Sequence, residues 1–96
     1  MLVSCETPIT DFENKVVLVG ELPLTVGKVF SIACLSAIPN QTDSPEDKLK
    51  CYALTKKASN GGTCEMNVDD LSFLKKRVGH VFNTLVYGWM CENVFT

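Results

Sequence analysis

Residues 69–89, DDLSFLKKRVGHVFNTLVYGW, decide the predicted fold because they form the longest segment with a clear helical period. At about 100° per residue, their apolar side chains fall on one stripe. The stripe consists of Leu71, Leu74, Val78, Val81, Phe82, Leu85 and Trp89. Asn67 or Asp69 can cap the start, and the acids Asp69 and Asp70 suit the positive N-terminal end of a helix. The pattern predicts one long helix over residues 69–89 that lies on a sheet.

The C-terminal part of this segment leaves an alternative open. Gly79 and Gly88 each weaken a helix by about 1 kcal/mol relative to alanine, and valine and threonine lose side-chain freedom in helices. A competing interpretation therefore ends the helix near Asn83 and makes residues 84–90 a last strand. The sequence does not decide between helix and strand for residues 84–90.

The segments before the helix favour strands. Residues 15–20, KVVLVG, are rich in β-branched side chains, which strands prefer. Residues 25–38, TVGKVFSIACLSAI, are apolar on both faces when read as a strand, which indicates a central strand covered on both sides. Residues 48–56 alternate in polarity, and the turn residues 59–62, SNGG, would pair them antiparallel with a strand at 63–68.

These segments predict an α+β fold in a single domain of residues 1–96. In this fold a four- or five-stranded, mostly antiparallel sheet packs against one long C-terminal helix. Residues 1–14 are expected to form an irregular N-terminal arm, and the proline- and acid-rich residues 39–47 a loop.

Composition narrows the possible functions and the expected location. The 96 residues carry a net charge of −2, whereas a dedicated nucleic-acid binder normally has a basic excess. The N-terminal sequence lacks the features of a signal peptide, and no apolar run approaches the ~20 residues of a membrane span. We therefore expect a cytoplasmic protein in a reducing environment.

The cysteines fit that expectation. They are widely spaced, without a C-x-x-C pair, and the chain has one histidine, so no zinc signature is present. The five are Cys5, Cys34, Cys51, Cys64 and Cys91. Reduced, buried thiols are the simpler interpretation, because free cysteine behaves as a small apolar residue.

Catalytic motifs are weak in this sequence. A cysteine–histidine nucleophile would need His80 beside a thiol, yet His80 is predicted on the helix face opposite the core. The adjacent acids Asp69 and Asp70 point about 100° apart on a helix and are ordinary at a helix start. We therefore expect no enzyme activity and no cofactor.

A second line of side chains runs along the predicted helix, opposite the core stripe. Phe73, His80 and Tyr87 are spaced seven residues apart, and Cys91 extends the line. Aromatic residues are not needed on a solvent-facing surface, so either a partner or the N-terminal arm is expected to cover them. A pair of identical helices about a two-fold axis would use the same residues in both subunits.

Basic residues suggest an alternative surface. Lysines near the turn and on the helix would attract an anionic ligand or a nucleic acid if they formed one patch. The patch would consist of Lys56, Lys57, Lys75, Lys76 and Arg77.

These features favour a non-catalytic protein-protein interaction or structural protein. We expect it to self-associate as a homo-oligomer through the outer helix face and a sheet edge, with another protein as a possible partner. Small accessory or structural proteins of viruses are one class with this profile. The alternative is a small anionic-ligand or nucleic-acid binding module that uses the basic residues.

Overall fold

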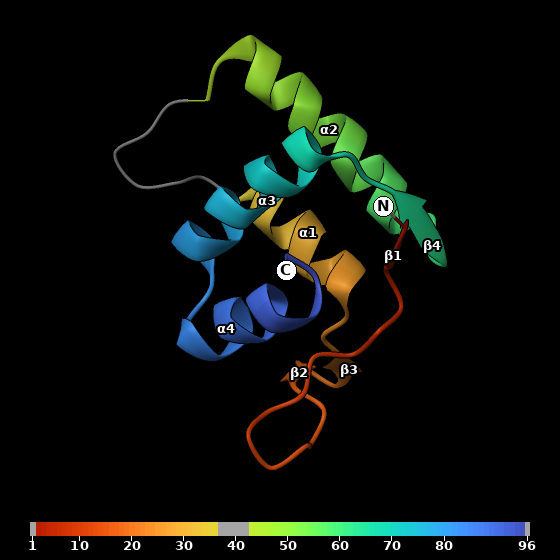
Figure 1. The fold of residues 1–96 in the computed structure, drawn as a ribbon, viewed down its shortest axis with the longest axis vertical. Coiled ribbons are helices and arrows are strands. Elements are labelled where there is room, and N and C mark those ends of the chain that lie inside the picture. Colours follow the sequence, from red (N-terminus) through yellow and green to blue (C-terminus); the bar gives the residue numbers. More distant parts are fainter. Residues whose placement is uncertain (1, 37–42, 96) are drawn as a thin grey trace.

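The computed structural model describes residues 2–36 and 43–95, which form four helices and four short strands. Residues 39–42 of the predicted loop 39–47 lie outside the described residues, and residues 45–47 belong to a helix and not to a loop. The helices are α1 (Val26–Leu35), α2 (Pro45–Ser59), α3 (Val68–Val81) and α4 (Thr84–Asn93). The strands are β1 (Leu2–Ser4), β2 (Leu18–Val19), β3 (Leu22–Pro23) and β4 (Thr63–Glu65). Figure 1 shows the helices grouped together, with β2 and β3 at the end of the molecule away from α2.

Helix α1 is the centre of the core. It packs against both α2 and α3, so side chains around most of its circumference are covered. Val29, Phe30 and Ala33 have no exposed surface. Leu54 from α2 and Leu74 and Val78 from α3 are buried in the same cluster. The burial of so many apolar side chains around one helix is the main apolar contribution to stability.

Local caps fix where the helices start. Ser44 accepts a hydrogen bond from the backbone N–H of Asp47, and Pro45 occupies the first turn of α2, where no N–H is needed. Asn67 and Asp70 form a reciprocal capping box at the start of α3, so Asn67 is the cap of the two candidates, Asn67 and Asp69. Asn83 accepts from the backbone N–H of Val86 and starts α4.

The strands form two separate antiparallel pairs. β1 pairs with β4, with Val3 opposite Cys64, and this pair joins the N-terminal segment to the stretch between α2 and α3. β2 pairs with β3 around a two-residue turn, in which Gly20 adopts φ 65. Residues 1–14, expected to be irregular, therefore include a regular strand.

The predicted sheet is wrong. The described residues contain two small two-stranded sheets, and no four- or five-stranded sheet packs on a helix. Residues 25–38 were expected to form a central strand, but Val26–Leu35 form α1. The apolar residues on both faces reflect a helix covered by neighbours on several sides, which a strand reading cannot distinguish over this length.

The third predicted strand is also helical. Residues 48–56 lie within α2, so the strand at 63–68 has no partner there and its paired part, β4, pairs with β1 instead. Lys48, Lys56 and Lys57 are exposed and Lys50 is half-buried, on a helix that buries Cys51, Leu54 and Ala58. These buried positions are spaced three and four residues apart, as a helix requires.

The predicted long helix is broken into α3 and α4. Phe82 and Asn83 have extended backbone angles, and Asn83 caps the next helix. The predicted core stripe is confirmed in α3, where Leu74 and Val78 are buried, whereas Leu85 and Trp89 belong to a second helix. The alternative that ended the helix near Asn83 was right about the end, but residues 84–90 are helical and not a strand.

Candidate interaction surfaces

The β2–β3 hairpin exposes apolar side chains on both faces. Leu18 and Leu22 keep 58% and 61% of their surface exposed, and Val19 keeps 48%. Val19 lies opposite Leu22, and Leu18 lies opposite Pro23, so the exposed side chains are divided between the two faces. We call Leu18, Val19 and Leu22 the hairpin patch. Neither face of this hairpin is buried against the core.

The base of the hairpin is held firmly. Ile9 is completely buried, donates its backbone N–H to the carbonyl of Leu24 and accepts from the N–H of Val17. Leu24 donates in turn to the carbonyl of Val17, which closes a ring of three hydrogen bonds. The hairpin patch is therefore presented from an ordered base and not from a loose loop.

The loop before the hairpin adds one more exposed aromatic residue. Asp11 accepts hydrogen bonds from the backbone N–H groups of Glu13 and Lys15 at 2.9 and 3.0 Å, which shapes the loop. Phe12 at its tip is 92% exposed. It lines a groove of about 510 Å³ together with Trp89 of α4, whose indole N–H donates to Thr10.

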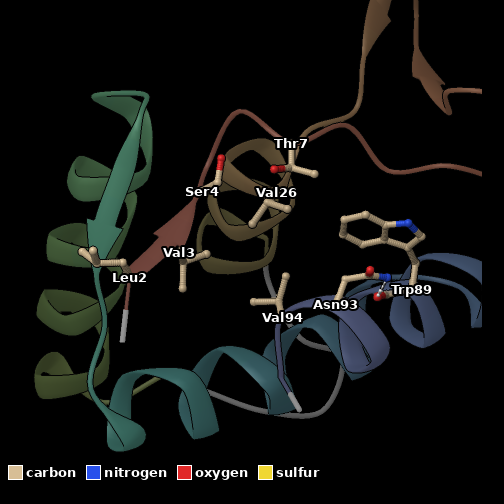
Figure 2. Close-up of a pocket in the computed structure, with 8 residues that line it drawn as sticks. All are labelled: Leu2, Val3, Ser4, Thr7, Val26, Trp89, Asn93 and Val94. Atoms are coloured by element: carbon tan, nitrogen blue, oxygen red, sulfur yellow. Dashed lines mark hydrogen bonds between the residues drawn. The ribbon is translucent and has the colours of Figure 1, made fainter.

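Figure 2 shows the residues that line a smaller hollow, which also borders Trp89 and has a volume of about 190 Å³. Val3 from β1, Val26 from α1 and Val94 after α4 form much of its apolar lining. Asn93 contributes a side-chain amide that donates to the carbonyl of Trp89. Among the described residues, no charged side chain lines this hollow, and Ser4 and Thr7 add polar groups to its lining.

The predicted interface residues fall on two helices. Phe73 on α3 is half-buried, with the cationic groups of Lys50 and Arg77 at 4.9 and 5.8 Å from its ring centre. His80 is exposed near the end of α3. Tyr87 on α4 is half-buried and folds back onto Gly79, where an added Cβ would lie 3.1 Å from the tyrosine ring.

Cys91 lies one turn after Tyr87. The side-chain hydrogen bond with Cys91 raises the pKa of Tyr87, and Cys91 itself is half-buried. The structure brings Tyr87 and Cys91 together on α4, while the break at Asn83 separates them from Phe73 and His80 on α3. These contacts of Phe73 and Tyr87 come from α2, α3 and α4, and cover by the N-terminal arm stays a prediction.

The predicted basic residues differ in their exposure to solvent. Lys56 and Lys57 are exposed near the end of α2, and Lys75 and Lys76 are exposed on α3. Lys57 donates to the backbone carbonyl of Glu65 at 3.4 Å. Arg77, the fifth member, is only 4% exposed and is engaged inside the protein.

Arg77 binds the C-terminal end of α1. Its guanidinium donates to the carbonyls of Ala33 at 2.8 Å, Ser36 at 2.9 Å and Cys34 at 3.4 Å. It also forms an ion pair with Asp43 at 3.1 Å. The last carbonyls of a helix have no partner within the helix and carry its negative dipole end. Arg77 therefore fixes α3 to α1 and is not a free cation of a ligand site.

Four of the five thiols, those of Cys5, Cys34, Cys51 and Cys64, are buried. Burial raises the pKa of Cys5 to about 12, and the neighbouring Cys64 thiol and the Glu6 carboxylate act in the same direction. Burial also raises the pKa of Cys34 to about 12, with a further contribution from Cys51. Residues 2–36 and 43–95 contain no group of three or more histidine, cysteine or acidic side chains placed to hold a metal ion.

Sequence reasoning missed one surface and one buried contact, the hairpin patch and the role of Arg77. The hairpin patch was read as part of a sheet strand, although the turn-forming Gly20–Glu21 and the nearby Pro23 were a signal of an isolated hairpin. The role of Arg77 had no local signal, because its partners lie 34 to 44 residues earlier in the chain.

Comparison with known proteins finds no matching family model, no matching curated protein and no matching solved structure. Among the helices in the described part of the chain, none combines the length and hydrophobicity needed to cross a membrane. The functional conclusion therefore depends on the surfaces themselves.

Proposed function

We propose that this chain is a non-catalytic interaction protein that self-associates through its hairpin patch. One observation carries the proposal: the ordered β2–β3 hairpin holds Leu18, Val19 and Leu22 in solvent, on both of its faces. Residues 16–24, VVLVGELPL, contain a single charged side chain, Glu21. Exposed, apolar and nearly uncharged strands invite pairing with another strand, and proteins commonly guard such edges with lysine.

The two edges of the hairpin are not equivalent. Because Leu24 donates to the carbonyl of Val17, the next pair along the ribbon, Leu18 and Pro23, is not hydrogen-bonded across the ribbon. Leu18 therefore directs its N–H and C=O to the outer edge of β2, whereas Pro23 has no N–H to offer at the outer edge of β3. This supports β2 as the edge that pairs.

A second copy of the chain is the proposed partner. Two β2 edges related by a two-fold axis would pair antiparallel, each presenting the same residues to the other. The exposed Phe12 lies in the loop next to the hairpin and enlarges the apolar area available. Because contacts that bury less than about 1,200 Å² are weak, we expect a dimer that dissociates in the micromolar range.

The test is the molar mass by light scattering as a function of concentration. The wild-type protein is expected to form a dimer at high micromolar concentration, and Leu18→Lys with Leu22→Lys is expected to give a folded monomer. A matched control is Leu35→Lys with Leu49→Lys, because those leucines are 71% and 70% exposed but lie on α1 and α2. A monomeric wild type, or equal dissociation by the control pair, would contradict the proposal.

The outer helix residues are a less direct test. Phe73→Lys with Tyr87→Lys would remove a ring that two cations contact and a ring that packs on Gly79. A loss of self-association in that variant would therefore be mixed with a loss of internal packing. The hairpin variants avoid this, because the three patch residues have large exposed fractions.

A further inference from the structure

Two buried thiols, Cys5 and Cys64, meet where β1 joins β4. Their sulfur atoms are 3.0 Å apart, and the two residues are only 3% and 7% exposed. Cys64 lies within β4 opposite Val3, and Cys5 follows β1 and donates its backbone N–H to the carbonyl of Gly62. Backbone hydrogen bonds on both sides therefore hold the two cysteines in place.

We propose that Cys5 and Cys64 are the site of an intrachain disulfide, formed by exchange with a low-molecular-weight disulfide such as oxidised glutathione. The bond would connect two residues 59 positions apart in sequence and tie β1 to β4. It requires the sulfur atoms to approach by about 1 Å from their present contact. The proposal is independent of self-association through the hairpin patch.

The exchange balances with one molecule of oxidised glutathione. The Cys5 thiolate attacks a glutathione sulfur, which forms a mixed disulfide and releases one glutathione thiolate. The Cys64 thiolate then attacks the Cys5 sulfur of the mixed disulfide, which forms the Cys5–Cys64 bond and releases the second glutathione thiolate. The two cysteine sulfurs lose two electrons, glutathione gains them, and the two protons from the cysteines go to the released thiolates.

Cys5 is the thiol that an external disulfide reaches first. It borders a surface hollow of about 360 Å³, which Lys28 and Glu6 also line. Lys28 supplies a positive charge near the site for the carboxylates of glutathione. Cys64 does not line this hollow, and its thiol donates to the carbonyl of Lys57 at 3.0 Å. This arrangement makes Cys5 the attacking thiol and Cys64 the resolving thiol.

The surroundings predict a slow reaction that accelerates with pH. The charged groups around the pair are Glu6 after β1, Lys28 on α1 and Lys57 on α2, whose ammonium group donates to the carbonyl of Glu65 beside Cys64. Burial and the adjacent Cys64 thiol raise the pKa of Cys5 to about 12, and only the thiolate attacks. The rate should therefore rise about tenfold per pH unit between pH 7 and 9 and should not level off there.

The test is disulfide mapping of the folded, full-length protein after incubation with oxidised glutathione. Cleavage after lysine and arginine places each cysteine in a different peptide, so every pairing has its own mass. These peptides are residues 1–15, 29–48, 51–56, 58–75 and 78–96. The expected product links 1–15 to 58–75 in a chain that stays monomeric on a denaturing, non-reducing gel. It should exceed glutathione-bound Cys5 by at least about tenfold, because the resolving thiol is already in place.

Variants identify the two roles. Cys64→Ser should trap glutathione on Cys5, Cys5→Ser should leave both peptides unlinked, and Cys91→Ser should leave the Cys5–Cys64 link unchanged. The mapping of the wild-type protein carries the test even where a serine variant folds poorly. The proposal is overturned if Cys5 and Cys64 stay reduced while glutathione accumulates on Cys91. It is also overturned if the 1–15 to 58–75 link joins two chains.

Discussion

Residues 16–24 and helix α1 are two apolar segments that follow one another in the chain and reach opposite environments. In α1, six of the ten residues are buried, and Phe30 has no exposed surface. In the β2–β3 hairpin, all four strand residues are exposed. Similar side chains therefore stabilise the fold in one segment and remain in water in the other.

Neighbouring elements account for the difference. Helix α1 is enclosed by α2 and α3, so a helix that is apolar around most of its surface can be buried. The hairpin has only two residues in each strand and a turn at Gly20, and its base alone contacts the core through Ile9 and Leu24. Hydrophobicity is comparable in the two segments, and the presence of covering elements decides which one becomes core.

The largest expected contrast comes from truncating one side chain in each segment. Phe30→Ala should destabilise the protein by about 3–5 kcal/mol, because it removes a fully buried ring and leaves a cavity. Leu22→Ala should change the free energy of unfolding by less than about 0.5 kcal/mol, because Leu22 is mostly exposed. Urea denaturation at low micromolar concentration measures both. Equal losses would show that the hairpin is part of the cooperative core.

The second largest expected loss of stability comes from replacing Arg77, which holds α3 against α1. Arg77→Ala should cost about 3 kcal/mol, because it leaves the carbonyls of Ala33 and Ser36 and the carboxylate of Asp43 without their partner. Arg77→Lys should recover little, since an ammonium group cannot form the same planar set of hydrogen bonds. Lys76→Ala is the matched control, because Lys76 is exposed. Similar denaturation midpoints for the Arg77 and Lys76 variants would contradict this role.

These contrasts show which parts of the fold are readable in the sequence. The start of α3 and its buried Leu74 and Val78 are predictable, because the cap and the helical period agree. The start of α2 is also encoded: Ser44, Pro45 and the acids that follow are a helix N-terminal signal, although they resemble a loop in isolation. The sequence therefore contains the start signal of α2 next to residues that also favour a loop.

Other features depend on contacts between distant residues. The helix identity of α1 follows from its cover by α2 and α3, because its β-branched and apolar residues suit a buried strand equally well. The separation of Phe73 from Tyr87 follows from the Asn83 cap and from the packing of Tyr87 on Gly79. Gly20–Glu21 suggests a hairpin turn. These residues do not show that the hairpin is exposed, because exposure depends on whether elements distant in sequence cover it.

Replacing a glycine by alanine should change the stability by a smaller amount, with opposite signs in the core and at the surface. Gly27 in α1 approaches neighbouring backbone so closely that an added Cβ would lie 3.0 Å from the carbonyl oxygens of Ala58 and Cys5. Gly27→Ala should therefore cost about 1–3 kcal/mol through overpacking. Gly88 on α4 has open space around the same position, so Gly88→Ala should stabilise the protein by about 0.5–1 kcal/mol through helix propensity. Thermal unfolding of the two variants measures opposite shifts, and a shift of the same sign in both would contradict the packing around α1.

The smallest expected effect on stability is the pH dependence that the buried Cys34 thiol contributes. Burial raises the pKa of Cys34 on α1 from 9.0 to about 12. Above pH 9 the unfolded chain loses this proton while the folded chain keeps it, so the contribution to stability is complete below pH 9 and is lost as the pH rises towards 12. Urea denaturation between pH 8 and 10.5 should show a decline in the free energy of unfolding that is shallower in Cys34→Ala than in the wild type.

Cys91→Ala is the control, since Cys91 is only half-buried and lies away from α1 on α4. An equal decline in wild type and Cys34→Ala would mean that the Cys34 thiol ionises as easily in the folded protein as in the unfolded chain, and that α1 is less enclosed than the hairpin comparison requires.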